Sequence, residues 1–382
     1  MTEDQFFDAP GGIRLCFRTD GDAAAVPLLL IAGLGLDLTS WPRSMLEGLL
    51  ARGFRVVRFD NRDAGRSTRV AAAPPSMLRQ LVARPPRGAY TLEHMAGDAA
   101  ALLEHLGVER AHVVGMSMGG MIAQSLAALD PPRVATLTSI FSTTGDRRVG
   151  QPARSTLLRM AKRPARTREQ WVARHLAMLD HIGSRAFPYD DPDERTWAAG
   201  AWDRGGGPAR SAGVARQIGA IQASGDRTAA LRRITAPTLV IHGDVDRMVH
   251  PSGGRATAAA IPGARHVEIA GMSHHLSPGI IDHLVDLIAA SAGTASAGTA
   301  SAGTQSASTA SAGTESASAE SAGAESASAE LAGTASAGVE SPNMLISPKY
   351  SVGPAAERPD ISHTRDISPA RAADVSHSGE SA

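Results

Sequence analysis

Apolar and polar positions in the first 290 residues follow two different periods. Short runs rich in apolar residues are typical of buried parallel strands, and such runs occupy 27–31, 111–114 and 237–241. The segment 265–269 is interpreted as a further strand. Longer stretches place their apolar residues at helical spacing, as in 92–106, 121–129, 168–179 and 279–288. This alternation predicts an α/β fold, with a mostly parallel sheet and helices on both of its faces.

One region interrupts this rhythm. Between 146 and 233 the sequence predicts helices and loops but no strand. One of these helices begins at Thr167, because Gln170 stands three residues later at the capping-box position. We expect 1–145 and 234–290 to form the α/β core, and 146–233 to form a helical cap over the active site.

The last part of the chain has a different composition. From 291 to 340 a five-residue unit of small residues repeats with variations, and Leu331 is its one large apolar residue. Such a segment buries too little apolar surface to offset the loss of chain entropy, so we predict a disordered tail over 291–382. The tail is read either as a flexible tether or partner-binding arm, or as a dispensable extension, and its composition favours the extension.

The segment Gly-Met-Ser-Met-Gly-Gly at 115–120 lies between a predicted strand and a predicted helix. The pattern G-x-S-x-G in that position predicts a nucleophile elbow, a strained turn that presents the hydroxyl of Ser117 at the edge of the sheet. Glycines on both sides let the strand and the helix approach without a clash of β-carbons. The motif is short enough to occur by chance, so its strand–turn–helix context carries the prediction.

Acidic residues and histidines follow the last two predicted strands. Asp244 and Asp246 come after 237–243, while His274 and His275 come after 265–269. Ligands of open α/β sheets bind at the carboxyl ends of the strands, and a triad on such a sheet runs Ser, acid, His along the chain. We therefore predict Ser117, Asp246 and His274 as the catalytic residues, with Asp244 and His275 as alternatives for the acid and the base.

These side chains suit nucleophilic catalysis. A serine hydroxyl attacks only when a base takes its proton, and His274 would be that base. Asp246 would hold the imidazole in the correct tautomer and stabilise its protonated form. The developing oxyanion needs two backbone donors, which we assign to the N–H groups of Met118 and of Leu34 in the segment Ala-Gly-Leu-Gly at 32–35.

Five segments carry a resemblance to a known family. They read Ala-Gly-Leu-Gly, Asp-Asn-Arg-Asp-Ala-Gly-Arg-Ser-Thr, the elbow, His-Gly-Asp-Val-Asp and Gly-Met-Ser-His, at 32–35, 60–68, 115–120, 242–246 and 271–274. Through them the chain resembles the α/β-hydrolase fold superfamily, and within it the aclacinomycin methylesterase-like hydrolases of actinobacteria. The superfamily more often has His-Gly at 32–33 and Gly at positions 63 and 273. Its pattern favours Asp246 over Asp244 as the acid.

The resemblance implies a serine hydrolase that needs neither a cofactor nor a metal. Its expected substrate is a carboxylic ester, methyl esters included, of a small and largely apolar molecule, cleaved through an acyl-enzyme. Lactonases, C–C hydrolases and cofactor-free haloperoxidases use the same three residues, and a hydrolase-derived binding protein with slow turnover is a further alternative. Trp171, Trp197 and Trp202 in the predicted cap are expected either to line an apolar substrate pocket or to form the cap's own core.

The charge balance restricts the partners. The chain has 38 basic and 38 acidic residues, which favours neither a nucleic acid nor an anionic membrane as a partner. We expect Asp60, Arg62 and Asp63 to hold their own loop through ion pairs and hydrogen bonds. The single cysteine, Cys16, and an acidic start without a signal-peptide pattern predict a cytoplasmic location. The sequence leaves the oligomeric state open.

Overall fold

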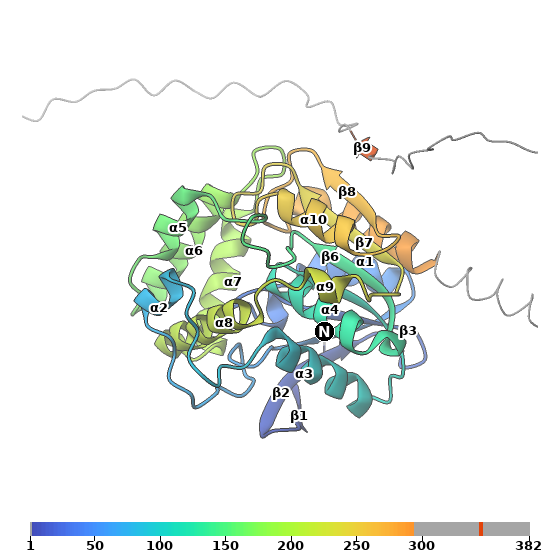
Figure 1. The fold of residues 1–382 in the computed structure, drawn as a ribbon, viewed down its shortest axis with the longest axis horizontal. Helices are drawn as coiled ribbons and strands as arrows, with labels where there is room; N and C mark the ends of the chain where they lie inside the picture. The colour runs from blue at the N-terminus through green and yellow to red at the C-terminus, as the bar shows by residue number, and fades with distance from the viewer. Residues whose placement is uncertain (1, 294–343, 347–382) are drawn as a thin grey trace, which may run out of the picture. The chain divides into compact units, whose positions relative to one another are not determined.

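The computed structural model describes residues 2–293 and 344–346, and a twisted sheet lies at its centre (Figure 1). Within these residues the strand order is β1-β2-β4-β3-β5-β6-β7-β8-β9. The first two pairings, β1 with β2 and β2 with β4, are antiparallel, and the later ones are parallel. The predicted α/β fold with a mostly parallel sheet is confirmed. The strands are Gln5–Ala9 (β1), Ile13–Asp20 (β2), Val26–Ile31 (β3), Phe54–Phe59 (β4), Ala111–Met116 (β5), Val134–Ile140 (β6), Thr238–Gly243 (β7), Arg265–Ile269 (β8) and Met344–Ile346 (β9).

Both faces of the sheet are covered, which explains why the central strand β3 is apolar along its whole length. In β3, Leu29 and Ile31 join the core cluster on one face, while Leu28 and Leu30 join the cluster on the other. The first cluster includes residues of α3 and α4, and the second includes residues of α1 and of the helical segment 281–293. Besides segment 281–293, helices of the core are Arg43–Ala51 (α1), Leu92–His105 (α3), Met118–Leu129 (α4) and Ser252–Ala260 (α10).

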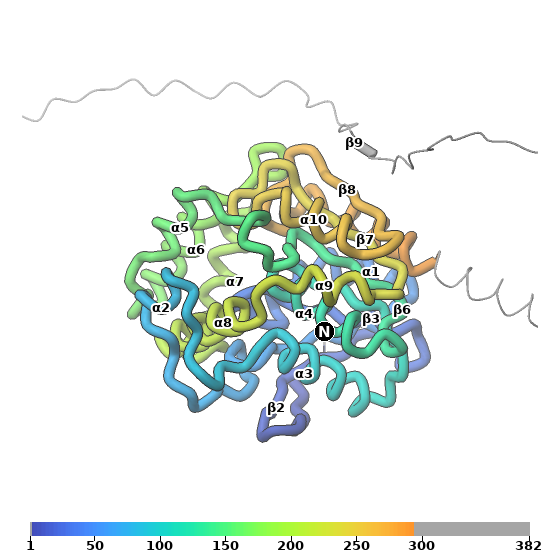
Figure 2. Tube along the Cα trace, viewed as in Figure 1, coloured from blue at the N-terminus to red at the C-terminus, as the bar shows by residue number. Residues whose placement is uncertain are grey.

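The helical insertion lies between β6 and β7, where the sequence predicts it. The tube of Figure 2 leaves the sheet after β6, passes through the green and yellow helices, and returns at β7. Thr167 accepts a hydrogen bond from the Gln170 N–H and starts α6, as expected from the capping pattern. The insertion consists of Arg154–Met160 (α5), Arg168–Ile182 (α6), Asp191–Arg204 (α7), Arg210–Ser224 (α8) and Thr228–Leu231 (α9).

A further short helix, Met77–Leu81 (α2), lies outside this insertion, in the connection from β4 to α3. The Gln222 side chain of α8 donates a hydrogen bond to the Gln80 carbonyl of α2 at 2.7 Å. The sequence pattern predicts no helix here. Two prolines before α2 and two after it obscure its short helical period.

The C-terminal boundary differs from the prediction. Helical structure continues to residue 293, and Ser291 and Ala292 are buried, so the core does not end at residue 290. The three residues of β9 pair in parallel with β8, which corrects the prediction of disorder for them. Met, Leu and Ile form a short apolar run there with strand propensity. The rest of the predicted tail lies outside the described residues.

Candidate active site

Ser117 stands on a strained turn between β5 and α4. Its backbone has φ 55° and ψ −120°, a conformation that a residue with a β-carbon rarely adopts. A β-carbon on Gly119 would lie 2.0 Å from the carbonyl oxygen of Ile31, and one on Gly115 would lie 2.2 Å from that of Gly119. The glycines are therefore required for the close approach of strand and helix, and the turn that they permit exposes the Ser117 hydroxyl at the strand end.

A chain of two hydrogen bonds connects three of the predicted residues. His274 Nε2 lies 3.0 Å from Ser117 Oγ, and His274 Nδ1 lies 2.7 Å from Asp246 Oδ2. Because an ionised carboxylate can only accept, Nδ1 carries the proton and Nε2 is left to accept from the serine hydroxyl. The two predicted alternatives have other partners. Asp244 accepts from the Gly271 N–H, and His275 Nε2 lies 2.9 Å from a carboxylate oxygen of the cap.

Asp246 is held in a fully buried position after β7. Its Oδ1 accepts from the backbone N–H groups of Met248 and Val249, while Oδ2 faces His274 and lies 3.4 Å from His242 Nε2. Burial alone raises the pKa of Asp246, but the charge of His274 and the hydrogen bonds of His242 and His274 outweigh burial and place this pKa below its ordinary value. Asp246 is therefore ionised at neutral pH and able to stabilise a protonated His274.

Phe141 also contacts the predicted base. Its ring centroid lies 4.4 Å from that of His274, and its backbone has a positive φ of 37°. A positive φ is costly for an aromatic residue, and the Phe141 N–H donates to the Ile241 carbonyl, which holds the residue in place. The sequence around Phe141 contains no motif that indicates either the strain or the contact.

The predicted oxyanion donors come from two elements that lie against each other. A β-carbon on Gly33 would lie 3.4 Å from the β-carbon of Ser117, so the turn after β3 borders the serine. Met118 follows Ser117 as the first residue of α4. In the part of the chain that the structure describes, neither the Leu34 N–H nor the Met118 N–H has a protein acceptor. Both groups are available to a negatively charged oxygen, and the positive end of the α4 dipole favours the same charge.

Asp60, from the loop after β4, joins the core to the cap. It accepts from the backbone N–H groups of Leu38 and Arg66, and from the Arg204 guanidinium of α7 at 2.6 Å. Burial raises the pKa of Asp60 to about 6, although the charge of Arg204 lowers it. Arg204 also lies 3.2 Å from the sulfur of Cys16 in β2. The expectation that Asp60 fixes this loop is confirmed, and the contact with the cap is an addition.

Two further ion pairs hold the same loop. The Arg62 guanidinium donates to both carboxylate oxygens of Asp98 in α3, at 2.6 and 2.7 Å. Asp63, which has φ 69°, accepts from Arg216 of α8 and from the Tyr90 hydroxyl. Arg62 and Asp63 thus have the structural role that the sequence predicts, and Asp63 is a second anchor for the cap.

The predicted pocket tryptophans make their contacts inside the cap. The Trp171 indole N–H donates to the Ala198 carbonyl, and its ring lies 6.3 Å from that of Trp202. Trp197 lies 4.9 Å from the ring of His175. These contacts favour the alternative in which the three tryptophans form the cap's own core, and their role in a substrate pocket stays a prediction.

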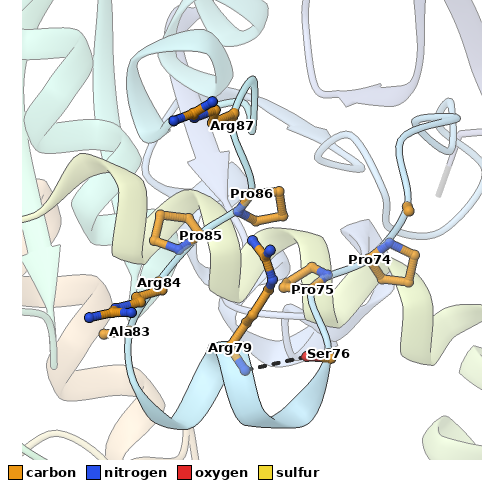
Figure 3. Close-up of a pocket in the computed structure, with 10 residues that line it drawn as sticks. Pro74, Pro75, Ser76, Arg79, Ala83, Arg84, Pro85, Pro86 and Arg87 are labelled. Atoms are coloured by element: carbon orange, nitrogen blue, oxygen red, sulfur yellow. Dashed lines mark hydrogen bonds between the residues drawn. The ribbon is translucent and has the colours of Figure 1, made fainter.

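A separate pocket of about 990 Å³ opens beside α2 (Figure 3). None of Ser117, Asp246 and His274 lines it. Pro75 of its wall would lie 3.5 Å from a β-carbon on Gly219, so the pocket borders the side of α8 that carries Gly219. The lining residues are Ala73, Pro74, Pro75, Ser76, Arg79, Ala83, Arg84, Pro85, Pro86 and Arg87.

Two observations bear on ions and membranes. Among residues 2–293 and 344–346, the side chains of His, Cys, Asp and Glu form no cluster of three or more that could hold a metal ion. In the same residues no helix combines the length and the apolar character that crossing a bilayer demands.

Comparison with known proteins places the chain among relatives of one fold. The family described as alpha/beta hydrolase fold matches residues 26–278. Rhodomycin D methylesterase DnrP of Streptomyces peucetius is 34% identical over 301 residues, covering 72% of this chain and 94% of the relative. The putative non-heme bromoperoxidase BpoC of Mycobacterium tuberculosis H37Rv is 28% identical, covering 67% and 89%. The solved enol-lactonase of Burkholderia xenovorans LB400 has a TM-score of 0.57 and 28% identity, covering 75% and 99%.

Proposed function

The chain belongs to the α/β-hydrolase fold family, and we propose that it hydrolyses carboxylic esters with Ser117 as nucleophile, His274 as general base and Asp246 as the residue that orients the base. One observation carries this proposal. His274 lies within hydrogen-bond distance of both partners, 3.0 Å from the serine oxygen and 2.7 Å from the carboxylate. This is the spacing that base-assisted nucleophilic attack requires.

The reaction would proceed in two halves. Ser117 Oγ attacks the ester carbonyl carbon while its proton passes to His274 Nε2, and the carbonyl oxygen becomes negatively charged. The N–H groups of Leu34 and Met118 stabilise that charge. His274 then gives the proton to the leaving alkoxide, which departs as the alcohol. A water molecule, deprotonated by the same nitrogen, attacks the acyl-enzyme in the second half and releases the acid.

Methyl esters are the substrate class that we propose first. Both relatives at 34% identity are named rhodomycin D methylesterase, and each is covered over 94% of its length. We extend to this chain only the ester class, as a methyl ester of a small, largely apolar molecule. Lactones are the second candidate, because the enol-lactonase structure is 28% identical and covered almost completely.

The division of labour between core and cap is part of the proposal. Residues 1–145 and 234–290 would supply the catalytic groups, and 146–233 would close over them and select the substrate. We further propose that the protein acts in a reducing compartment such as the cytoplasm, without a nucleic acid or membrane partner. The single cysteine and the balanced charge support this.

A substrate panel with a matched pair of variants tests the proposal. Methyl esters, p-nitrophenyl acetate and butyrate, and lactones are offered to the purified protein, which is also labelled with a fluorophosphonate. Ser117→Ala should abolish labelling and leave only a small residual rate. Ser125→Ala is the control, because its hydroxyl donates to the Met121 carbonyl within α4 and takes no part in the site. A fully active Ser117→Ala variant refutes the mechanism, and the panel separates esterase from lactonase.

A further inference from the structure

The turn that would supply one oxyanion donor is held at successive peptide groups. On its core side the Asn61 side-chain amide donates to the Ala32 carbonyl at 3.1 Å. The Leu36 N–H donates to the Gly33 carbonyl at 3.2 Å. Because the C=O and N–H of one peptide group point in opposite directions, a Gly33 carbonyl aimed at Leu36 turns the Leu34 N–H the other way. These two bonds define the direction of the predicted donor, but they come from the core alone.

The other side of the turn is held by the cap. The Gly35 N–H donates to Gln217 Oε1 at 2.8 Å, and the Gly35 carbonyl accepts from Arg210 Nη2 at 2.9 Å. Both side chains come from α8. The turn also packs on that helix, since a β-carbon on Gly35 would lie 2.7 Å from a methyl group of Val214. The second half of the oxyanion turn is therefore built by the insertion and not by the sheet.

The Gln217 side chain uses both ends of its amide to bond core residues. Its side chain is 0% exposed, and its Nε2 donates to the Arg62 carbonyl at 2.9 Å while its Oε1 holds Gly35. One amide thus bridges two core loops, and it needs both a donor and an acceptor for this. A buried amide with both ends satisfied has little freedom to rotate, so it fixes the position of the turn.

We propose that Gln217 is a positioning residue for ester hydrolysis. From α8 of the cap it fixes the position of the oxyanion turn, so the rate of catalysis depends on how α8 packs on the core. With Gln217 in place, the Gly35 N–H is occupied and the Leu34 N–H is the free donor of the turn. Without it the Gly35 amide is unpaired and the turn can shift. An oxyanion donor acts within a narrow range of distance, so a small shift costs rate more than substrate binding. The inference rests on the proposed function, because it assigns Leu34 to the oxyanion hole.

The experiment compares two glutamines of one helix. Gln217→Met keeps the length and removes both hydrogen bonds, while Gln222→Met removes only the bond to the Gln80 carbonyl, away from the site. The kcat and KM for p-nitrophenyl butyrate are measured, together with the affinity for a boronic acid that forms a tetrahedral adduct with serine. We expect Gln217→Met to lower kcat about 10- to 100-fold with KM changed less than about threefold, and to weaken boronic acid binding by a similar factor. Gln222→Met should leave all three values near those of the parent protein.

The kcat of Gln217→Met decides whether Gln217 has the positioning role. If kcat of Gln217→Met is unchanged, or falls only as much as that of Gln222→Met, the positioning role is wrong. If Gln217→Met does not fold, Gln217→Asn decides by the same kcat and boronic acid criteria. It keeps an amide but is one methylene too short to span Gly35 and Arg62. Failure of the proposed function is distinguishable, because then Ser117→Ala itself would stay active.

Discussion

The nucleophile turn and the cap meet the rest of the molecule in opposite ways. At the turn two backbones touch with no side chain between them, and a β-carbon on Gly119 would lie 2.0 Å from the Ile31 carbonyl oxygen. At the cap, long polar side chains reach across to core loops, as Arg204 does to Asp60 and Arg216 does to Asp63. The contact at the turn requires glycines, which have no β-carbon, whereas the contact at the cap requires pairs of opposite charges. The turn is therefore set by its own few residues, whereas the seating of the cap depends on partners far away in the sequence.

The largest expected effect lies on the core side of this comparison. Asp246→Asn removes the charge opposite His274 and favours the wrong tautomer, so we expect kcat to fall by about 10⁴ with little change in KM. Asp244→Asn is the matched control, because an asparagine oxygen can still accept from the Gly271 N–H. Steady-state kinetics on the best ester of the panel decide the matter. If kcat falls strongly in Asp244→Asn and not in Asp246→Asn, the acid of the triad is Asp244.

A smaller effect, on stability, is expected where the cap is anchored. Arg216→Met leaves the buried carboxylate of Asp63 without its ion partner, which should cost about 3–5 kcal/mol of unfolding free energy. The double variant Asp63→Asn with Arg216→Met removes the stranded charge and should recover part of the loss. Denaturant unfolding measures both. If the single variant is as stable as the parent, the cap is not held by its charges and the comparison fails.

The smallest effect on stability is expected at Glu194, which bonds to the loop that carries the predicted base. Glu194 of α7 accepts from His175 at 2.8 Å and from His275 at 2.9 Å. Burial opposes ionisation of Glu194, but the two histidine bonds outweigh it and lower its pKa from 4.5 to about 2. A folded pKa below the unfolded one means that this stabilisation is complete above about pH 4.5 and is lost as the pH falls through 2.

Glu194→Gln tests the contribution of the Glu194 carboxylate through the pH dependence of stability. The variant should be about 1–3 kcal/mol less stable than the parent near pH 6, and the difference should shrink as the pH falls from 4.5 toward 2. Thermal unfolding across this range is the measurement. A difference that stays constant with pH would show that the carboxylate charge contributes nothing.

Local patterns predicted the parts of the site that are built locally. Strands β3, β5, β7 and β8, the elbow at Ser117 and the strand ends before Asp246 and His274 were placed from apolar runs and short motifs. Gln217 and Phe141 could not be found in this way. Gln217 matters through Gly35 and Arg62, each more than 150 residues distant, and Phe141 through a backbone conformation that its sequence does not indicate. The antiparallel β1–β2 pair was also missed because it lies outside the alternation of strands and helices, and α2 was missed because it has only five residues.

Cys16 offers a chemical measure of local opening, because its thiol lies against Arg204 of the cap. It is the only cysteine of the chain, it is 0% exposed, and burial raises the pKa of its thiol to about 12. Thiol reagents react with exposed thiolates, so the native protein offers them neither exposure nor charge. Reaction therefore requires an opening that exposes the sulfur, and Arg204 of α7 is one of the groups that lie against it. The labelling rate then measures how often such an opening occurs, and the signal comes from one thiol because the chain has a single cysteine.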